Sequence, residues 1–155
     1  MEAHTSSPGL RLRVRQATMH WGERAYIGLY RLLGGRWVQR WTFGTPVVLL
    51  TTTGRQSGRP RTVALGHMQV GGGLVVAGTN GGKQRLPAWV WNLRSDPRCL
   101  VEAGRERFDA TAEFLEGDAY QAIWNRLVAE HPIYQTAREL LARSIPLVVL
   151  HPVKD

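Results

Sequence analysis

The sequence contains little cysteine and no long apolar run, and both shortages restrict the kind of protein it encodes. Cys99 is the single cysteine among 155 residues, so no disulfide can form within the chain. That fits a reducing cytoplasm better than secretion. No stretch approaches the roughly 20 apolar residues of a membrane span, and the first twenty residues lack the apolar core of a signal peptide. We therefore expect a cytoplasmic protein.

Acidic residues are scarce in the first part of the chain. Residues 1–61 contain ten arginines and two acidic residues, whereas residues 62–155 contain ten basic and ten acidic ones. The whole formal net charge of +8 therefore comes from the first part. Such an asymmetry predicts an acidic partner there, which could be phospholipid, nucleic acid or a phosphate-bearing cofactor.

Metal-ligand spacings and catalytic pairs are also missing. No nucleophile with a neighbouring base and no carboxylate pair stands out, and the histidines are scattered without metal spacing: His4, His20, His67, His131 and His151. We expect no metal site. Where a sequence lacks an acid, a base and a metal, difficult chemistry is most economically assigned to a bound cofactor.

The length predicts one domain, covering residues 18–155, behind a polar and disordered tail at residues 1–17. In residues 18–36 the apolar side chains recur at steps of three and four with arginines between them, which is typical of an amphipathic helix. Two interpretations stay open. The helix packs on the core, or it also touches an anionic membrane peripherally as part of a basic segment at residues 11–40.

Six apolar or β-branched runs are bounded by glycine, proline and polar residues, and they predict strands at 46–53, 61–70, 74–78, 98–102, 107–115 and 145–150. Helical spacing marks 87–94, 118–130, where Asp118 is the expected N-cap, and 134–142. Strands and helices do not alternate as in a doubly wound sheet. We therefore expect an α+β fold: a six-stranded antiparallel barrel, closed or split, with peripheral helices.

The loop at residues 54–61, Gly-Arg-Gln-Ser-Gly-Arg-Pro-Arg, combines glycines with cations directly after the first predicted strand. Glycines let backbone N–H groups approach anionic oxygens, and arginine forks bind phosphate or carboxylate. A plain surface turn with solvated arginines is the alternative. The loop at 79–83 follows a strand of the same direction, so both loops should lie at one end of the barrel.

Four segments together resemble the deazaflavin-dependent nitroreductase family. They are LTTTGRQSGRPRT at 50–62, TNGG at 79–82, PAWVWNLR at 87–94 with Asp96 and Pro97, and IPLVVL at 145–150. The resemblance covers residues 18–152 in unbroken order. It implies a split β-barrel similar to pyridoxamine-phosphate oxidases and flavin reductases, and binding of coenzyme F420. It also implies an F420H2-dependent reductase of quinones, nitroaromatics or activated alkenes, found in actinobacteria.

By position, the resemblance implies cofactor contacts at Arg55, Gln56, Ser57, Gly58, Arg61, Thr62, Val63, Ala64, Leu65, Gly66, His67, Ala77, Gly78, Thr79, Asn80, Ala88, Trp89, Val90, Trp91 and Asn92. The first loop would hold the phosphate and the acidic glutamyl tail. The end of the third strand and the helix with Trp89 would flank the deazaflavin ring.

The resemblance also implies catalytic residues on the acceptor side, Tyr134 and His131, either of which could supply a proton. The chain departs from the family at Gln56, where many relatives have lysine, and at Asn80, where some do. Arg59, Lys83 and Arg85 are then the alternative partners for the tail.

A second function class stays open beside the enzyme: a non-catalytic carrier of F420 or of a fatty acid on the same fold. A nucleic-acid-binding role is not expected, because the basic N-terminal segment has no recognised reader motif. The expected partner is a small-molecule hydride acceptor, and the expected assembly is a monomer or a homodimer.

Overall fold

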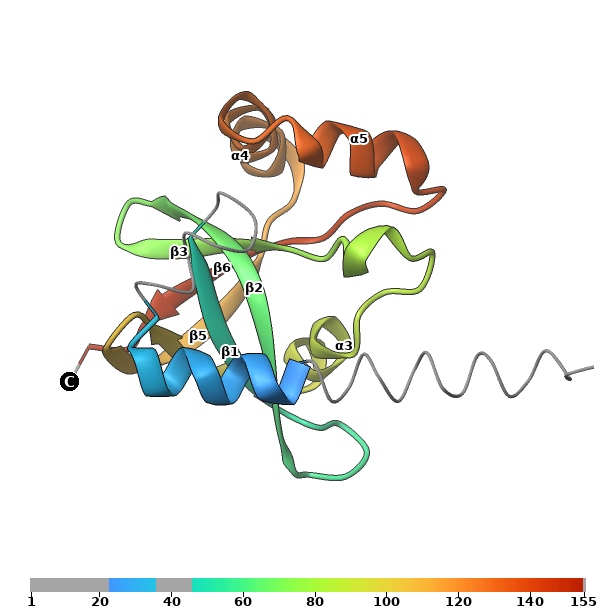
Figure 1. Cartoon of the computed structure of the whole chain (residues 1–155). Coiled ribbons are helices and arrows are strands. Elements are labelled where there is room, and N and C mark those ends of the chain that lie inside the picture. The colour runs from blue at the N-terminus through green and yellow to red at the C-terminus, as the bar shows by residue number, and fades with distance from the viewer. Residues whose placement is uncertain (1–22, 36–45, 155) are drawn as a thin grey trace, which may run out of the picture.

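The computed structural model of the chain describes residues 23–35 and 46–154 (Figure 1). The tail predicted at 1–17 lies outside these ranges. So do the two ends of the helix predicted at 18–36 and most of the segment 11–40. Residues 23–33 are helical, as the apolar spacing predicts.

Six strands form a closed barrel in the order β1-β2-β3-β6-β5-β4. All six neighbouring pairs are antiparallel. The strands are β1 (Val47–Thr53), β2 (Pro60–Val70), β3 (Gly73–Ala77), β4 (Arg98–Ala103), β5 (Glu106–Phe114) and β6 (Leu147–Pro152). The expected antiparallel barrel with peripheral helices is confirmed.

Helices surround the barrel on several sides (Figure 1). They are α3 (Ala88–Ser95), α4 (Gly117–Glu130), α5 (Ile133–Leu140) and the short 3-10 helix η1 (Asn80–Gly82), besides residues 23–33. Trp89, Val90 and Leu93 of α3 pack with the inward side chains of the barrel strands. Trp124 and Leu127 of α4 instead pack on Val75 and Val149, which face outward from β3 and β6. Among the described helices, none is long and apolar enough to cross a membrane.

Strand β1 is buried on both of its faces. Val48 and Leu50 belong to the barrel interior, whereas Val47 and Leu49 pack against Tyr30 of the N-terminal helix. A strand covered on both sides reads as a continuous apolar run instead of an alternating one. The helix at 23–33 is therefore part of the core packing, as the first of the two open interpretations expects.

Several predicted boundaries differ from the structure by one or two residues, and two of these differences have a clear cause. The last strand begins at Leu147, not at 145, because the carbonyls before it bond elsewhere. The Ile145 carbonyl accepts from the Tyr120 hydroxyl at 2.7 Å, and the Pro146 carbonyl accepts from the Gly78 N–H at 2.8 Å. Helix α4 has Glu116 at its N-cap position, and Asp118 lies in the first turn, where a carboxylate still favours the helix dipole.

Candidate anion-binding cleft

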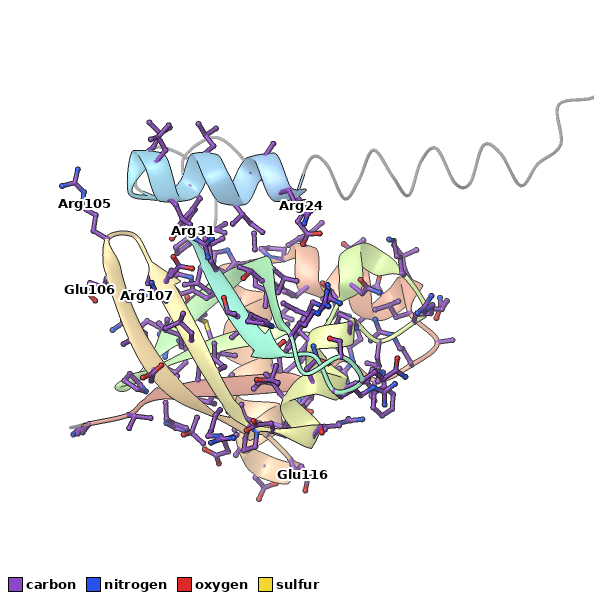
Figure 2. All side chains as sticks on the ribbon, turned by 90° about the horizontal axis from the view of Figure 1, so that it is seen from below. Arg24, Arg31, Arg105, Glu106, Arg107 and Glu116 are labelled. Carbon is purple, nitrogen blue, oxygen red and sulfur yellow. The ribbon has the colours of Figure 1, made fainter. Side chains whose placement is uncertain are left out.

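A cleft of about 1330 Å³ lies between the N-terminal helix, the β1–β2 loop and α3. Five of its lining residues are arginines, and Glu23 is the acidic one: Glu23, Arg24, Ile27, Arg31, Thr52, Gly54, Arg55, Gln56, Ser57, Pro60, Arg61, Thr62, Val63, Arg85, Leu86, Ala88, Trp89, Trp91 and Asn92. Arg24 and Arg31 extend from the helix toward the barrel (Figure 2). A concave site with this excess of one sign concentrates anionic ligands.

The β1–β2 loop is tightly folded at its two glycines. The Gly54 N–H donates to the Arg59 carbonyl at 2.8 Å, and the Gly58 N–H donates to the Gly54 carbonyl at 2.7 Å. A Cβ on Gly54 would stand 2.6 Å from the Ser57 Oγ and 3.2 Å from the Arg59 carbonyl oxygen, so a side chain there would require the Ser57 side chain to move. Gly58 has φ of +67°, a left-handed conformation that other residues rarely adopt.

The same loop presents donors that the protein does not use. Within the described residues, the N–H groups of Gln56 and Ser57 have no hydrogen-bond acceptor, and the Arg61 guanidinium has no partner. The Arg55 guanidinium lies 5.2 Å from the centre of the Trp91 ring, a cation–π contact. Backbone donors beside two arginines can bind a phosphate or a carboxylate.

Asn92 fixes this loop to α3. Its Oδ1 accepts from the Arg55 N–H at 3.0 Å, and its Nδ2 donates to the Thr52 Oγ1 at 3.0 Å. The residue is 5% exposed, and its amide is the bridge between the loop and the helix. Asn92 therefore positions Arg55 at the cleft, and both polar atoms of its side chain are already hydrogen-bonded within the protein.

Arg143, which sequence reasoning missed, holds the segment between β3 and α3. Its guanidinium donates to six backbone carbonyls at 2.9–3.2 Å: those of Gly78, Thr79, Lys83, Gln84, Arg85 and Ser144. The Asn80 Nδ2 also donates to the Arg85 carbonyl at 2.9 Å. Burial lowers the pKa of Arg143. These bonds fix the segment whose end supplies Arg85 and Leu86 to the cleft.

Ten of the twenty predicted cofactor contacts line this cleft: Arg55, Gln56, Ser57, Arg61, Thr62, Val63, Ala88, Trp89, Trp91 and Asn92. The other ten do not line it: Gly58, Ala64, Leu65, Gly66, His67, Ala77, Gly78, Thr79, Asn80 and Val90. Val90 is fully buried in the core, and Ala64 packs under the N-terminal helix. A Cβ on Gly78 would stand 3.1 Å from Pro146 and 3.2 Å from Val90, so this glycine permits close packing.

The N-terminal helix contributes lining residues that the sequence analysis did not assign to the site, namely Glu23, Arg24, Ile27 and Arg31. Their spacing of one, three and four residues puts them on one face of the helix. The signal was present as arginines interleaved with the apolar stripe. It indicated a membrane or a core contact as readily as a ligand.

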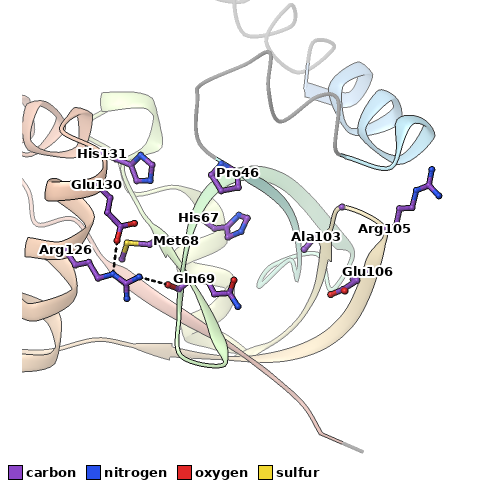
Figure 3. A pocket seen from close by; sticks show the side chains of 11 residues that line it. Pro46, His67, Met68, Gln69, Ala103, Arg105, Glu106, Arg126, Glu130 and His131 are labelled. Carbon is purple, nitrogen blue, oxygen red and sulfur yellow. Dashed lines mark hydrogen bonds and ion pairs between the residues drawn. The ribbon is translucent and has the colours of Figure 1, made fainter.

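A second pocket of about 630 Å³ lies at the other end of the β1–β2 pair (Figure 3). His67 and His131 line it, together with Arg126 and Glu130, which form an ion pair at 2.9 Å. The His67 Nδ1 is buried without a hydrogen-bond partner in the described part of the chain. Desolvation lowers the pKa of His67, and the neighbouring Pro46 backbone opposes that shift. The neutral imidazole is therefore favoured at this pocket.

Tyr134 lies near this pocket but does not line it. Its ring contacts His131 edge-on with 6.3 Å between the ring centres, and it packs in the cluster that contains Met68 and Ala77. Burial raises the pKa of Tyr134, so the hydroxyl stays protonated at neutral pH. No acceptor or donor for that hydroxyl is found among residues 23–35 and 46–154. Neither Tyr134 nor His131 lines the arginine-rich cleft.

Cys99 takes no part in either pocket. It is buried in the core, where desolvation raises the pKa of its thiol to about 11. The thiol is therefore protonated and unreactive at neutral pH.

Comparison with known proteins gives a consistent result. The model of the family described as F420H(2)-dependent quinone reductase matches residues 22–152. The chain is 31% identical over 131 residues to an F420H(2)-dependent quinone reductase of Mycobacterium tuberculosis H37Rv, covering 82% of this chain and 87% of that protein.

Solved structures agree. An F420-H2 dependent reductase called FDR-A is 32% identical with a TM-score of 0.62, and the match covers 68% of this chain and 94% of that one. A structure described as a domain-swapped dimer is 28% identical with a TM-score of 0.64, and the match covers 94% of this chain and 100% of that one.

Proposed function

Because this chain belongs to the F420H2-dependent quinone reductase family, we propose that its arginine-rich cleft binds coenzyme F420 and that the protein reduces an organic acceptor. The membership confirms the family resemblance predicted from the four sequence motifs and the reductase class. The observation that carries the cofactor assignment is the set of unused donors in the cleft, because the coenzyme carries a phosphate and an acidic glutamyl tail. Bound F420 in its reduced form supplies a hydride.

The residues of the cleft fit such a group in two parts. Arg55, Arg61 and the N–H groups of Gln56 and Ser57 would hold the phosphate and the tail by charge-assisted hydrogen bonds. Val63, Leu86 and the α3 tryptophans offer apolar and aromatic surface for the planar ring, flanked by the predicted contacts at Ala77–Asn80. The protein would thereby supply position and electrostatics for the transfer.

A quinone is the acceptor class that we propose first, with nitroaromatics and activated alkenes as further acceptors. The proposal is tested by titrating the purified protein separately with F420, FMN and NADPH. We expect F420 to bind at micromolar affinity or better and FMN far more weakly. Tight binding of FMN without binding of F420 would falsify the assignment. A carrier without activity would bind F420 yet fail to oxidise F420H2 in the presence of menadione.

We propose Tyr134 and His131 as the acceptor-side residues, with the Tyr134 hydroxyl as a hydrogen-bond donor to developing negative charge. Tyr134→Phe should lower turnover of menadione by about tenfold, with F420 affinity within a few fold of wild type, because a bond made mainly in the transition state acts on the rate. Steady-state kinetics with F420H2 measure this effect. If His131 supplies the proton, the double variant with His131→Ala should lose further activity.

Tyr120→Phe is the matched control for this substitution. The Tyr120 hydroxyl donates to the Ile145 carbonyl at 2.7 Å, so its removal should lower stability by about 1 kcal/mol and leave turnover unchanged. Equal turnover in Tyr134→Phe and wild type would exclude the Tyr134 hydroxyl from the mechanism. Unchanged turnover in the double variant would leave water as the proton source.

Peripheral membrane contact through the N-terminal helix remains part of the proposal. Leu29, Leu32 and Leu33 are exposed, and their spacing puts them on the helix side that does not line the cleft. Leu32 is 81% exposed.

We expect Leu32→Glu to reduce binding to anionic vesicles by several fold in a flotation assay, because a carboxylate there opposes insertion among lipid headgroups. Leu140→Glu on α5, where the leucine is also largely exposed, should bind vesicles as wild type does. Identical flotation of both variants would remove the helix from any membrane role.

The homodimer is the assembly that we propose. It is supported by the relative described as a domain-swapped dimer, because the match covers 100% of that relative's chain.

A further inference from the structure

Two arginines that line the cleft, Arg24 and Arg31, come from the N-terminal helix, outside the segments that the family motifs cover. We propose that Arg24, on the N-terminal helix, binds the acidic glutamyl tail of the cofactor, so that this helix forms a cationic wall of the site. The inference rests on the proposed F420 binding and extends it to a residue 26 positions before the first family motif at residue 50.

The position of the helix is fixed by contacts at its C-terminal half. The Tyr30 hydroxyl donates to the Val47 carbonyl at 2.8 Å and accepts from the Gly104 N–H at 2.8 Å. Arg31 binds Glu102 through two hydrogen bonds of 3.0 and 2.8 Å. These contacts attach the helix to β1 and to the β4–β5 hairpin. Six residues of α-helix rise about 9 Å, so the same anchors place Arg24 a fixed distance further along the cleft.

Arg24 differs from the neighbouring Arg31 in what it contacts. Arg31 is already neutralised by Glu102, whose ion pair with it measures 2.8 Å. Arg24 has neither a hydrogen-bond acceptor nor an ion-pair partner in the described part of the chain, although it lines the cleft beside Ile27. A cation at a concave site that no protein carboxylate satisfies is available to a ligand carboxylate.

The charge distribution of the cleft indicates a ligand with more than one negative group. Arg55 and Arg61 come from the β1–β2 loop and the start of β2, and Arg85 comes from the segment before α3. Arg24 adds a further cation to the same cleft from a separate element, the N-terminal helix. A chain of carboxylates that extends from the phosphate could reach both groups of arginines. The tail of F420 has this chemistry.

Arg24 could instead stay solvated and only add to the positive potential of the cleft, without contacting the tail. Comparing a ligand that has the tail with one that lacks it tests for a direct contact. The experiment measures dissociation constants by fluorescence titration for wild type, Arg24→Gln and Arg107→Gln. Arg107 is exposed on β5 and is not among the residues that line the cleft, and its replacement removes the same charge. Each protein is titrated with F420 and with the deazaflavin nucleoside, which has the ring but neither phosphate nor glutamate.

We expect Arg24→Gln to weaken F420 binding by about threefold to tenfold and to leave nucleoside binding within twofold. Arg107→Gln should bind both ligands as wild type does. Glu23→Gln removes the acidic lining residue and should tighten F420 binding by about twofold. Circular dichroism of the variants checks that the helix is retained.

Two results would overturn the inference. If Arg24→Gln binds F420 as tightly as Arg107→Gln does, Arg24 does not contact the tail. If Arg24→Gln weakens both ligands equally, the helix acts on the fold of the cleft and not on the tail. A wild-type protein that binds neither ligand would instead overturn the proposed function itself.

Discussion

Replacing Arg55 and Arg61 together with alanine should weaken F420 binding by at least about 30-fold. Each charge-assisted hydrogen bond to a phosphate or carboxylate contributes about 1–3 kcal/mol, and 1.4 kcal/mol corresponds to a factor of ten in affinity. The two losses act on one ligand and should accumulate to at least about 2 kcal/mol. Isothermal titration calorimetry of the single and double variants measures the effect.

Salt dependence gives an independent reading of the same contacts. Affinity of the wild type should fall as salt concentration rises, and the double variant should show a shallower fall because two cationic contacts are missing. Arg107→Ala serves as the control with one charge removed elsewhere. Full affinity in the double variant would mean that the tail is held by other cations, and Lys83 with Arg85 would be tested next.

Arg143→Met should lower the melting temperature by about 5–15 °C. The substitution keeps a long apolar side chain but removes the donors for six carbonyls, of which the more exposed can turn to water. The free energy of unfolding should fall by about 2–4 kcal/mol, because several hydrogen bonds from a charged donor are lost. Each kcal/mol lowers the melting temperature by about 2–4 °C at this chain length. Thermal unfolding followed by circular dichroism measures it.

The same variant should also bind F420 more weakly, because Arg85 and Leu86 are no longer held at the cleft. Arg143→Lys should recover little, since an ammonium has three donors and cannot reproduce the planar fork. Arg138→Met is the control, because the Arg138 guanidinium makes a cation–π contact, 5.0 Å from the centre of the Trp124 ring. A melting temperature within about 2 °C of wild type would show that the carbonyls are satisfied without Arg143.

The barrel was predictable because its information is local. Each strand is an apolar or β-branched run that ends at a glycine or proline turn, and the turns at Gly71 and Gly104 have the positive φ that glycine allows. The β1–β2 loop was predictable for the same reason, because its glycines and arginines are adjacent in the sequence. Its proposed role in cofactor binding rests on the order of the four motifs.

The rest of the site depends on contacts between distant residues. The guanidinium of Arg143 bonds to carbonyls some 60 positions earlier, and carbonyls carry no residue-specific signal in the sequence. Asn92 lines the cleft as a predicted cofactor contact, and the sequence did not indicate that its amide also bridges Thr52 and the Arg55 N–H. For the helix at 23–33, the apolar stripe predicts that it packs. Which barrel face it covers depends on the hydrogen bonds of Tyr30 to the Val47 carbonyl and of Arg31 to the Glu102 carboxylate.

The closure of the barrel also determines when the site can form during folding. Pairs such as Leu50 with Val101 and Val75 with Val149 join residues about 50 and 75 positions apart, so loop-closure entropy is lost before these contacts are made. Folding should therefore be slow for a chain of this size. The cleft needs β1, β2, α3 and the N-terminal helix together, so an unfinished barrel has no binding site. The coenzyme then acts after the rate-limiting step: it shifts the folding equilibrium by mass action and slows unfolding, and it leaves the rate of folding unchanged.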